Sequence, residues 1–266
     1  MLNKNTFSKI LVFITTALLG FSTSNAAVSD STNLILSKQD CYERICEWTN
    51  IGIGGAYYNT NGESADIGGY AGYISLFGKA ALKQRLQLGA NITLGGGKSD
   101  LSGTSPMGAK NNTNLMIFDF DLKFGINIAS KESPIFINLL GGLDVYSTNK
   151  DEKKFRRSLG LAGIEIEGEK PISTKLSVMY GASYSFIVAG NYLFNNKDTR
   201  AQIPFSMKNY AISANIGLWY EIERGISTYA RLVGKYQNIG ASEKINHSFM
   251  PATQNYVAMV EFGIGF

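Results

Sequence analysis

After residue 26 the chain contains no apolar run long enough for a membrane-spanning helix, which needs about 18 consecutive apolar residues. Backbone polar groups in lipid must be paired within a helix or a closed sheet. Any membrane insertion by this part of the chain must therefore use strands. Charged residues are also scarce, at 17% of the 266 residues, whereas a soluble helical protein of this length normally carries more.

Histidine, cysteine and net charge are low as well, and each restricts the possible chemistry. The only histidine is His247, and the only cysteines are Cys41 and Cys46. No second cysteine pair or nearby histidine completes a metal-ligand set, so we expect no metal and no cofactor. The formal charge of +4 falls to +2 when Lys4 and Lys9 are removed with the leader described below, which argues against a nucleic-acid partner.

The N-terminus has the pattern of a secretory signal peptide over residues 1–26. Lys4 and Lys9 precede an apolar core, Ile10–Leu19, and Ser24–Ala26 forms a small-residue cleavage site. The alternative is a transmembrane anchor, but the apolar core is shorter than a spanning helix requires.

Residues 27–47 are then expected to form a short periplasmic segment that precedes the folded domain. Both cysteines fall within it. Because the periplasm is oxidising, Cys41 and Cys46 are candidates for an intramolecular disulfide.

The rest of the chain has the period-two alternation of β-strands. In the last eleven residues, every second side chain counted back from Phe266 is apolar, as a strand with lipid on one side requires. Ten segments of this kind follow one another: Thr49–Tyr58, Ile67–Lys79, Leu86–Leu94, Phe118–Ile128, Ile135–Val145, Ser158–Glu169, Leu176–Val188, Tyr210–Tyr220, Ile226–Gln237 and Tyr256–Phe266. We predict an all-β, transmembrane, antiparallel up-and-down β-barrel over residues 48–266 with about ten strands, and with eight or twelve as alternatives.

The connections and the aromatic residues support a barrel in a membrane. Short connections alternate with five longer polar ones, which are predicted as loops: Asn59–Asp66, Lys98–Thr113, Thr148–Arg157, Gly190–Met207 and Ile239–Gln254. Aromatic residues near the loop ends of the strands are predicted to form a belt at the lipid–water interface: Tyr57, Tyr58, Tyr146, Tyr192, Phe194, Tyr236 and Tyr256. A soluble β-sandwich or lipocalin-like barrel would also alternate, but it would not normally combine a signal peptide, long strands and a terminal Phe.

Together these features resemble the superfamily of small bacterial outer-membrane β-barrel proteins, over residues 48–266. The resemblance implies that Phe266 belongs to the C-terminal signal that the barrel assembly machinery reads. It also implies a monomer in outer-membrane lipid and lipopolysaccharide, with both termini periplasmic and the long loops extracellular.

Strand parity predicts which polar side chains face the interior of the barrel. The set contains both signs of charge: Asp119, Asp121, Lys123, Asp144, Glu165, Glu167, Glu221, Arg231, Lys235 and Glu261. These charges are predicted either to pair and fill a closed barrel or to line a narrow pore.

The loops offer a second candidate site. One of them carries a basic cluster that could contact lipopolysaccharide phosphates or an acidic host surface: Lys150, Lys153, Lys154, Arg156 and Arg157. We therefore expect a non-enzymatic structural or surface-interaction protein with an adhesin-like role. A narrow passive channel for small solutes is the alternative.

An outer-membrane enzyme ranks third, and no catalytic residue is predicted. Omptin-type proteases, which resemble this architecture, use an Asp pair and a His–Asp pair at the extracellular rim. Here no Asp accompanies His247, and Asp119 and Asp121 are expected mid-strand. Lipid A-modifying barrels use a Ser–His arrangement, but adjacent residues such as His247 and Ser248 point to opposite faces of an extended segment.

Overall fold

The computed structural model describes residues 45–62, 65–103, 110–150, 153–194, 199–223, 225–244 and 249–266. The predicted signal peptide and residues 27–44 lie outside this part of the chain, and so does His247. The strands are β1 (Ile45–Gly62), β2 (Ala65–Leu82), β3 (Leu86–Gly103), β4 (Lys110–Asn127), β5 (Ile135–Lys150), β6 (Lys153–Pro171), β7 (Leu176–Phe194), β8 (Thr199–Gln202), β9 (Tyr210–Glu223), β10 (Ile226–Ile239) and β11 (Thr253–Gly265). The first strand thus begins before the expected position 48. No helix in the described residues is both long and apolar enough to cross a membrane.

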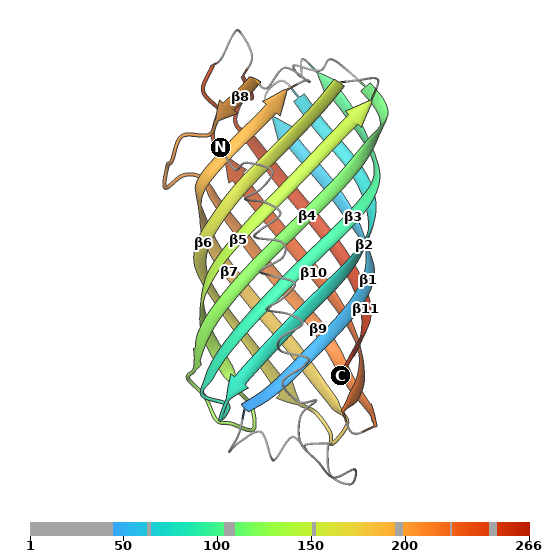
Figure 1. Ribbon diagram of the computed structural model, residues 1–266, viewed down its shortest axis with the longest axis vertical. Coiled ribbons are helices and arrows are strands. Elements are labelled where there is room, and N and C mark those ends of the chain that lie inside the picture. Colours follow the sequence, from blue (N-terminus) through green and yellow to red (C-terminus); the bar gives the residue numbers. More distant parts are fainter. Residues whose placement is uncertain are drawn as a thin grey trace, which may run out of the picture.

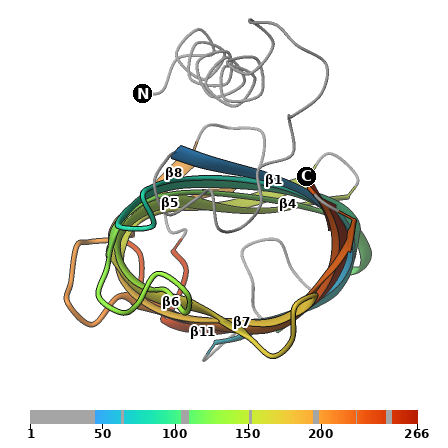
Figure 2. The same cartoon turned by 90° about the horizontal axis from the view of Figure 1, so that it is seen from below.

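Ten of these strands form a closed antiparallel barrel, which confirms the predicted fold and strand number (Figures 1 and 2). Each barrel strand pairs with the preceding and the following barrel strand, so that β7 pairs directly with β9, and the sheet closes where β1 pairs with β11. The remaining strand, β8, pairs only with the last residues of β7 and was not predicted. Closure leaves no open edge in the ten-stranded barrel, which is the condition for crossing lipid with strands.

The C-terminal residue completes the closing strand. The backbone N–H of Phe266 donates to the carbonyl oxygen of Thr49, and the N–H of Thr49 donates to the carbonyl oxygen of Phe266, both at 2.9 Å. We call the end of the barrel that holds these residues the terminal end, and the opposite end, beside β8, the distal end.

The outer surface carries a broad apolar band that begins at the terminal end. Large apolar side chains point outward from every barrel strand, including Ile53 at 65% exposure and Leu139 at 67%. Such a surface would be unstable in water and is suited to lipid.

Aromatic side chains mark the distal edge of this band. Tyr236 lies 5.1 Å from Tyr256 and 6.0 Å from Tyr210, whose ring stacks on Tyr184 at 5.6 Å, measured between ring centroids. From Tyr256 to Phe266 the strand advances about 33 Å at roughly 3.3 Å per residue. With a tilt of roughly 40°, this gives an apolar band about 25 Å high, which matches the hydrocarbon thickness that outer-membrane barrels span.

Four of the predicted belt residues lie elsewhere. Tyr58, Tyr146, Tyr192 and Phe194 are buried inside the barrel at exposures below 10%. For the last two, the cause is a register shift between β6 and β7 at Gly160. The extra residue in β7 reverses the parity of its distal part, and so turns those side chains inward.

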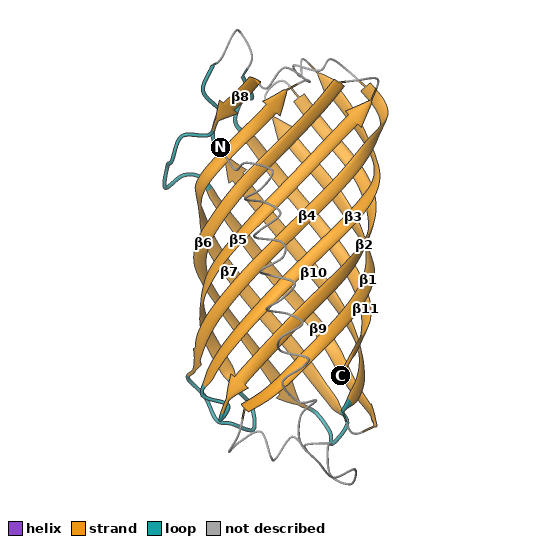
Figure 3. Ribbon diagram, in the orientation of Figure 1, coloured by secondary structure: helices purple, strands orange, loops and turns teal. Residues whose placement is uncertain are grey.

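The connections at the distal end are shorter than predicted, because the strands continue through most of the expected loops (Figure 3). For example, β3 and β4 extend through much of 98–113, and β5 and β6 leave only residues 151–152 between them. At the terminal end, the β2–β3 connection is a tight turn in which Lys83 and Gln84 both have a positive φ of 51°.

Candidate functional site in the barrel interior

The interior of the barrel changes character along its length. In the terminal part of β4, Leu122 and Phe124 point outward while Lys123 points inward. Further toward the distal end of the same strand, Asn114 points outward and Leu115 is buried inside. The interior is thus polar where the exterior is apolar, and apolar where the exterior is polar.

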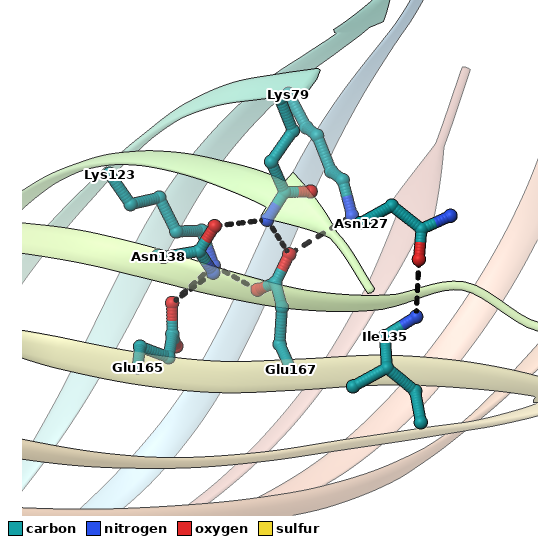
Figure 4. A network of polar contacts seen from close by, with 8 residues as sticks. Lys79, Lys123, Asn127, Ile135, Asn138, Glu165 and Glu167 are labelled. Atoms are coloured by element: carbon teal, nitrogen blue, oxygen red, sulfur yellow. Dashed lines mark hydrogen bonds and ion pairs between the residues drawn. The ribbon is translucent and has the colours of Figure 1, made fainter. Parts of the chain in front are cut away.

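A network of ion pairs bridges one side of the terminal half (Figure 4). The Lys123 ammonium lies between two carboxylates of β6, bonding Glu167 and lying 3.1 Å from Glu165 Oε2. Lys79 of β2 reaches Glu167 Oε1 at 3.0 Å. Asn138 donates to Glu165 at 3.2 Å. Because β2 and β6 are not neighbours in the sheet, the Lys79–Glu167 pair crosses the inside of the barrel.

A second polar cluster lies on β10 and β11. Glu261 is 1% exposed; it accepts a hydrogen bond from the Tyr229 hydroxyl at 2.8 Å and one from Arg231 Nη2 at 3.1 Å. On the adjacent strand, a Cβ atom at Gly52 would lie 2.4 Å from the Tyr229 hydroxyl. Glycine at this position therefore lets the tyrosine and the carboxylate pack against the wall.

Two further pairs lie nearer the distal half. Lys235 Nζ is 3.1 Å from Asp119 Oδ2, and Arg157 Nη2 is 2.8 Å from Asp144 Oδ1. Gln237 donates to the other oxygen of Asp144 at 2.9 Å. Each carboxylate in these pairs thus has a cationic partner, as burial demands.

A mainly apolar plug occupies the distal interior. Its centre is a set of aromatic rings, in which Phe155 lies 5.7 Å from Tyr192 and 5.9 Å from Phe194. Tyr58 and Tyr146 pack at 5.9 Å beside them. Other buried members are Ile67, Leu101, Leu115, Ile117, Leu159, Ile187, Ile239 and Met250. The guanidinium of Arg157 lies 5.7 Å from the Tyr146 ring, so the last ion pair abuts the plug.

Among the interior ion pairs lies a cavity of about 120 Å³. One side of it carries charged residues, among them Lys123, Arg231 and Lys235, and the β7–β9 side carries small polar ones such as Ser183 and Ser213. Short side chains on that wall leave the space open, and its polar lining suits several water molecules.

Comparisons with known proteins place the fold. No protein-family model matches the sequence, and no curated protein matches it. The outer-membrane protease OmpT from Escherichia coli superposes with a TM-score of 0.59 at 10% identity, over 85% of this chain and 97% of that chain. The translocator domain of the autotransporter NalP from Neisseria meningitidis gives 0.43 at 13% identity, over 97% of both chains. Neisserial surface protein A gives 0.35 at 10% identity, over 82% of this chain and 95% of that chain.

The fold is that of the bacterial outer-membrane β-barrel proteins. At 10% identity, the likeness to OmpT concerns the fold alone.

The two remaining predicted interior residues lie as follows. Asp121 lines the cavity, and Glu221, near the terminal end of β9, is half-buried opposite Ser227. The partners Lys79, Gln87 and Tyr229 were not among the predicted site residues. Parity alone would have found their inward positions, but only the three-dimensional fold shows which of them meet.

The basic cluster is not a loop, which corrects the sequence prediction. Lys150 ends β5, and Lys153, Lys154 and Arg156 belong to β6. Arg157 is 5% exposed and bonded to Asp144 inside the barrel. The strand alternation separates Arg157 from Lys154 and Arg156, which share the outward face of β6.

Only one of the two cysteines of the predicted disulfide lies in the described residues. Cys46, on β1, is buried and disulfide-bonded. Cys41 lies outside the described residues, so the predicted pairing stays a prediction.

The described residues bring together no catalytic constellation that we can recognise. Asp119 and Asp121 lie in the middle of β4, and Asp119 forms an ion pair with Lys235. The described residues contain no histidine to act as a base, and no group of three or more His, Cys, Asp or Glu side chains among them could hold a metal ion.

Proposed function

We propose that this protein is a non-enzymatic outer-membrane barrel with a structural or surface-interaction role, performed by its distal end. In this proposal the distal end faces outward from the cell and the terminal end faces the periplasm. One observation carries the proposal: ion pairs occupy the terminal half of the described interior around a small cavity, and mainly aromatic and aliphatic side chains occupy the distal half.

Two physical barriers then oppose passage of solutes. An ion entering the terminal half must compete with carboxylates and cations that already neutralise each other. Beyond them, the plug around Phe155 and Leu159 consists mainly of aromatic and aliphatic side chains, which replace an ion's hydration shell poorly.

Planar-bilayer recording of the purified full-length protein tests the closed interior, with a known porin as the positive control. We expect no conductance steps above the bare bilayer. Regular steps would instead favour the alternative, a narrow channel.

A channel is the second candidate because of the cavity among the interior ion pairs. If it is part of a pathway, its charged lining should set ion selectivity. Neutralising the lining residue Arg231 should then shift the reversal potential, and Asp119→Asn, at the residue paired with Lys235, should shift it in the opposite sense.

The distal rim supports an interaction role through its outward polar surface. Lys154, Arg156 and Arg200 lie on β6 and β8, and the register brings Arg156 and Arg200 to opposite sides of Leu193. Such a group of cations suits the phosphates of lipopolysaccharide or an acidic host surface.

Exchange of surface segments tests the interaction role. Replacing residues 104–109 or, in a second variant, 244–249 with Gly-Ser linkers should abolish binding to host cells or matrix, while replacing the terminal-end connection 128–134 should not. Equal binding by all three proteins would contradict a distal interaction surface.

We propose no catalysis, although the similar structure OmpT is a protease. The buried, ion-paired position of Asp119 supports this view. Protease activity of the purified protein that His247→Ala abolishes would overturn it.

A further inference from the structure

A short turn between β8 and β9 exposes two large apolar side chains outside the barrel. Phe205 is 63% exposed and Met207 is 75% exposed, and both follow Ile203, which is buried. In Figures 1 and 2 the segment between β8 and β9 stands out sideways from the wall, away from the interior. We call residues 203–209 the β8–β9 turn.

The turn is braced at both ends. Asn209, which is 2% exposed, donates from its backbone N–H to Ser206 at 2.9 Å and from its side chain to the carbonyl oxygen of Pro204 at 2.9 Å. Its side-chain oxygen accepts from the N–H of Gly240 at 2.7 Å. Asn238 also donates to the carbonyl oxygen of Lys208 at 2.7 Å. These bonds fix the backbone on either side of the apolar pair.

The height of the turn on the barrel identifies its surroundings. Tyr210 follows immediately, and its ring belongs to the outer aromatic belt, 5.6 Å from Tyr184 and 6.0 Å from Tyr236. A segment that projects outward at the belt meets the boundary between lipid headgroups and acyl chains.

We propose that the β8–β9 turn is a membrane-interface anchor in which Phe205 and Met207 insert among the lipid acyl chains. The neighbouring Lys208 then lies at headgroup height, where a cation favours lipid phosphates. The partner is bilayer lipid, because an ordered turn that exposes two large apolar groups at the belt has lipid as its nearest apolar medium. This lipid contact would stand whether the protein acts as an adhesin or as a channel.

Site-directed spin labelling of the full chain in dioleoylphosphatidylcholine vesicles tests the anchor. A nitroxide is attached to Phe205→Cys or, as an independent site, to Met207→Cys, without reduction of the Cys46 disulfide. The ratio of collision with oxygen to collision with a water-soluble nickel chelate reports immersion. Ile212→Cys on the lipid-facing surface and Asn61→Cys on the distal polar surface provide the two references.

We expect a ratio several-fold higher at both turn positions than at position 61, and close to that at position 212. Ratios equal to that at position 61 would overturn the anchor. Spectral broadening that disappears when labelled protein is diluted with unlabelled protein would also overturn it, because a second copy would then cover the turn. Adding Asn209→Ala should lower the ratio at position 205, and an unchanged ratio would show that the bracing bonds do not hold the side chains in lipid.

Discussion

The terminal and distal halves of the barrel have opposite arrangements of polar and apolar side chains. In the terminal half, Ile164 and Ile166 face outward on β6 while Glu165 and Glu167 form ion pairs inside. In the distal half of the same strand, Lys154 and Arg156 face outward. There Phe155 and Leu159 are buried inside.

The surrounding medium explains this reversal. Where lipid covers the wall, apolar side chains gain nothing from moving inside, so the interior can hold charges provided that they are paired. Where water covers the wall, apolar burial stabilises the fold as in a soluble protein. The aromatic belt lies between these two regimes, and the interior changes from ion pairs to apolar packing near the same level.

The largest effect is expected from breaking the terminal network. Lys123→Met leaves Glu165 and Glu167 buried without the cation between them, and removing one partner of a buried pair costs about 3–5 kcal/mol. Guanidinium unfolding in lipid vesicles, followed by tryptophan fluorescence, measures the loss. Lys170→Met, on the exposed end of β6, should be nearly neutral. Equal losses in the two variants would show that the network does not stabilise the barrel.

The distal plug should respond to volume rather than to charge. Leu159 has 0% exposure, and truncation to alanine should cost about 3 kcal/mol through lost contacts and a cavity. Leu159→Met nearly conserves volume and should cost less than about 1.5 kcal/mol. The same unfolding assay compares them. If the methionine variant were as unstable as the alanine variant, the plug would not be a close-packed core.

The reversal also explains which parts of the fold the sequence could predict. Alternation with apolar residues outward identified all ten barrel strands and the inward positions of residues such as Asp119 and Glu261. It could not identify the distal strand ends, because their polar residues face water and were interpreted as loops. Arg157 was misplaced for this reason.

The pairing of interior charges and the inward orientation of Tyr192 and Phe194 lay beyond sequence reasoning for a different cause. Lys79 and Glu167 are far apart in the chain and meet only because the barrel closes. Tyr192 turns inward because of one extra residue in β7, and nothing in the alternation of that segment marks where the parity changes.

A pair of outward substitutions on one strand tests where lipid ends. Ile53→Lys places a cation in the apolar band and should cost about 2–3 kcal/mol in vesicles, whereas Asn61→Lys, toward the distal end of β1, should cost nearly nothing. The free energy of unfolding in vesicles distinguishes them. Similar costs at both positions would place the membrane boundary beyond the aromatic belt.

The smallest effect is expected in the belt itself. Tyr236 packs between Tyr210 and Tyr256, and aromatic pairs of this kind contribute about 0.5–1.5 kcal/mol beyond the area that they bury. Tyr236→Ala should therefore destabilise the barrel by roughly 1–2 kcal/mol, and Tyr236→Leu, which keeps the apolar bulk but removes the ring and its hydroxyl, by less.

Varying the bilayer thickness distinguishes the contribution of ring packing at Tyr236 from the contribution of its position at the lipid–water interface. If the belt marks the interface, the cost of Tyr236→Ala should change between vesicles of short and long acyl chains, because the altered site moves relative to the headgroups. The cost of Leu159→Ala, inside the plug, should stay the same in both. If the cost of Tyr236→Ala were as insensitive to bilayer thickness as the cost of Leu159→Ala, Tyr236 would act only through ring packing. The change from a polar to an apolar interior would then require a cause other than the membrane boundary.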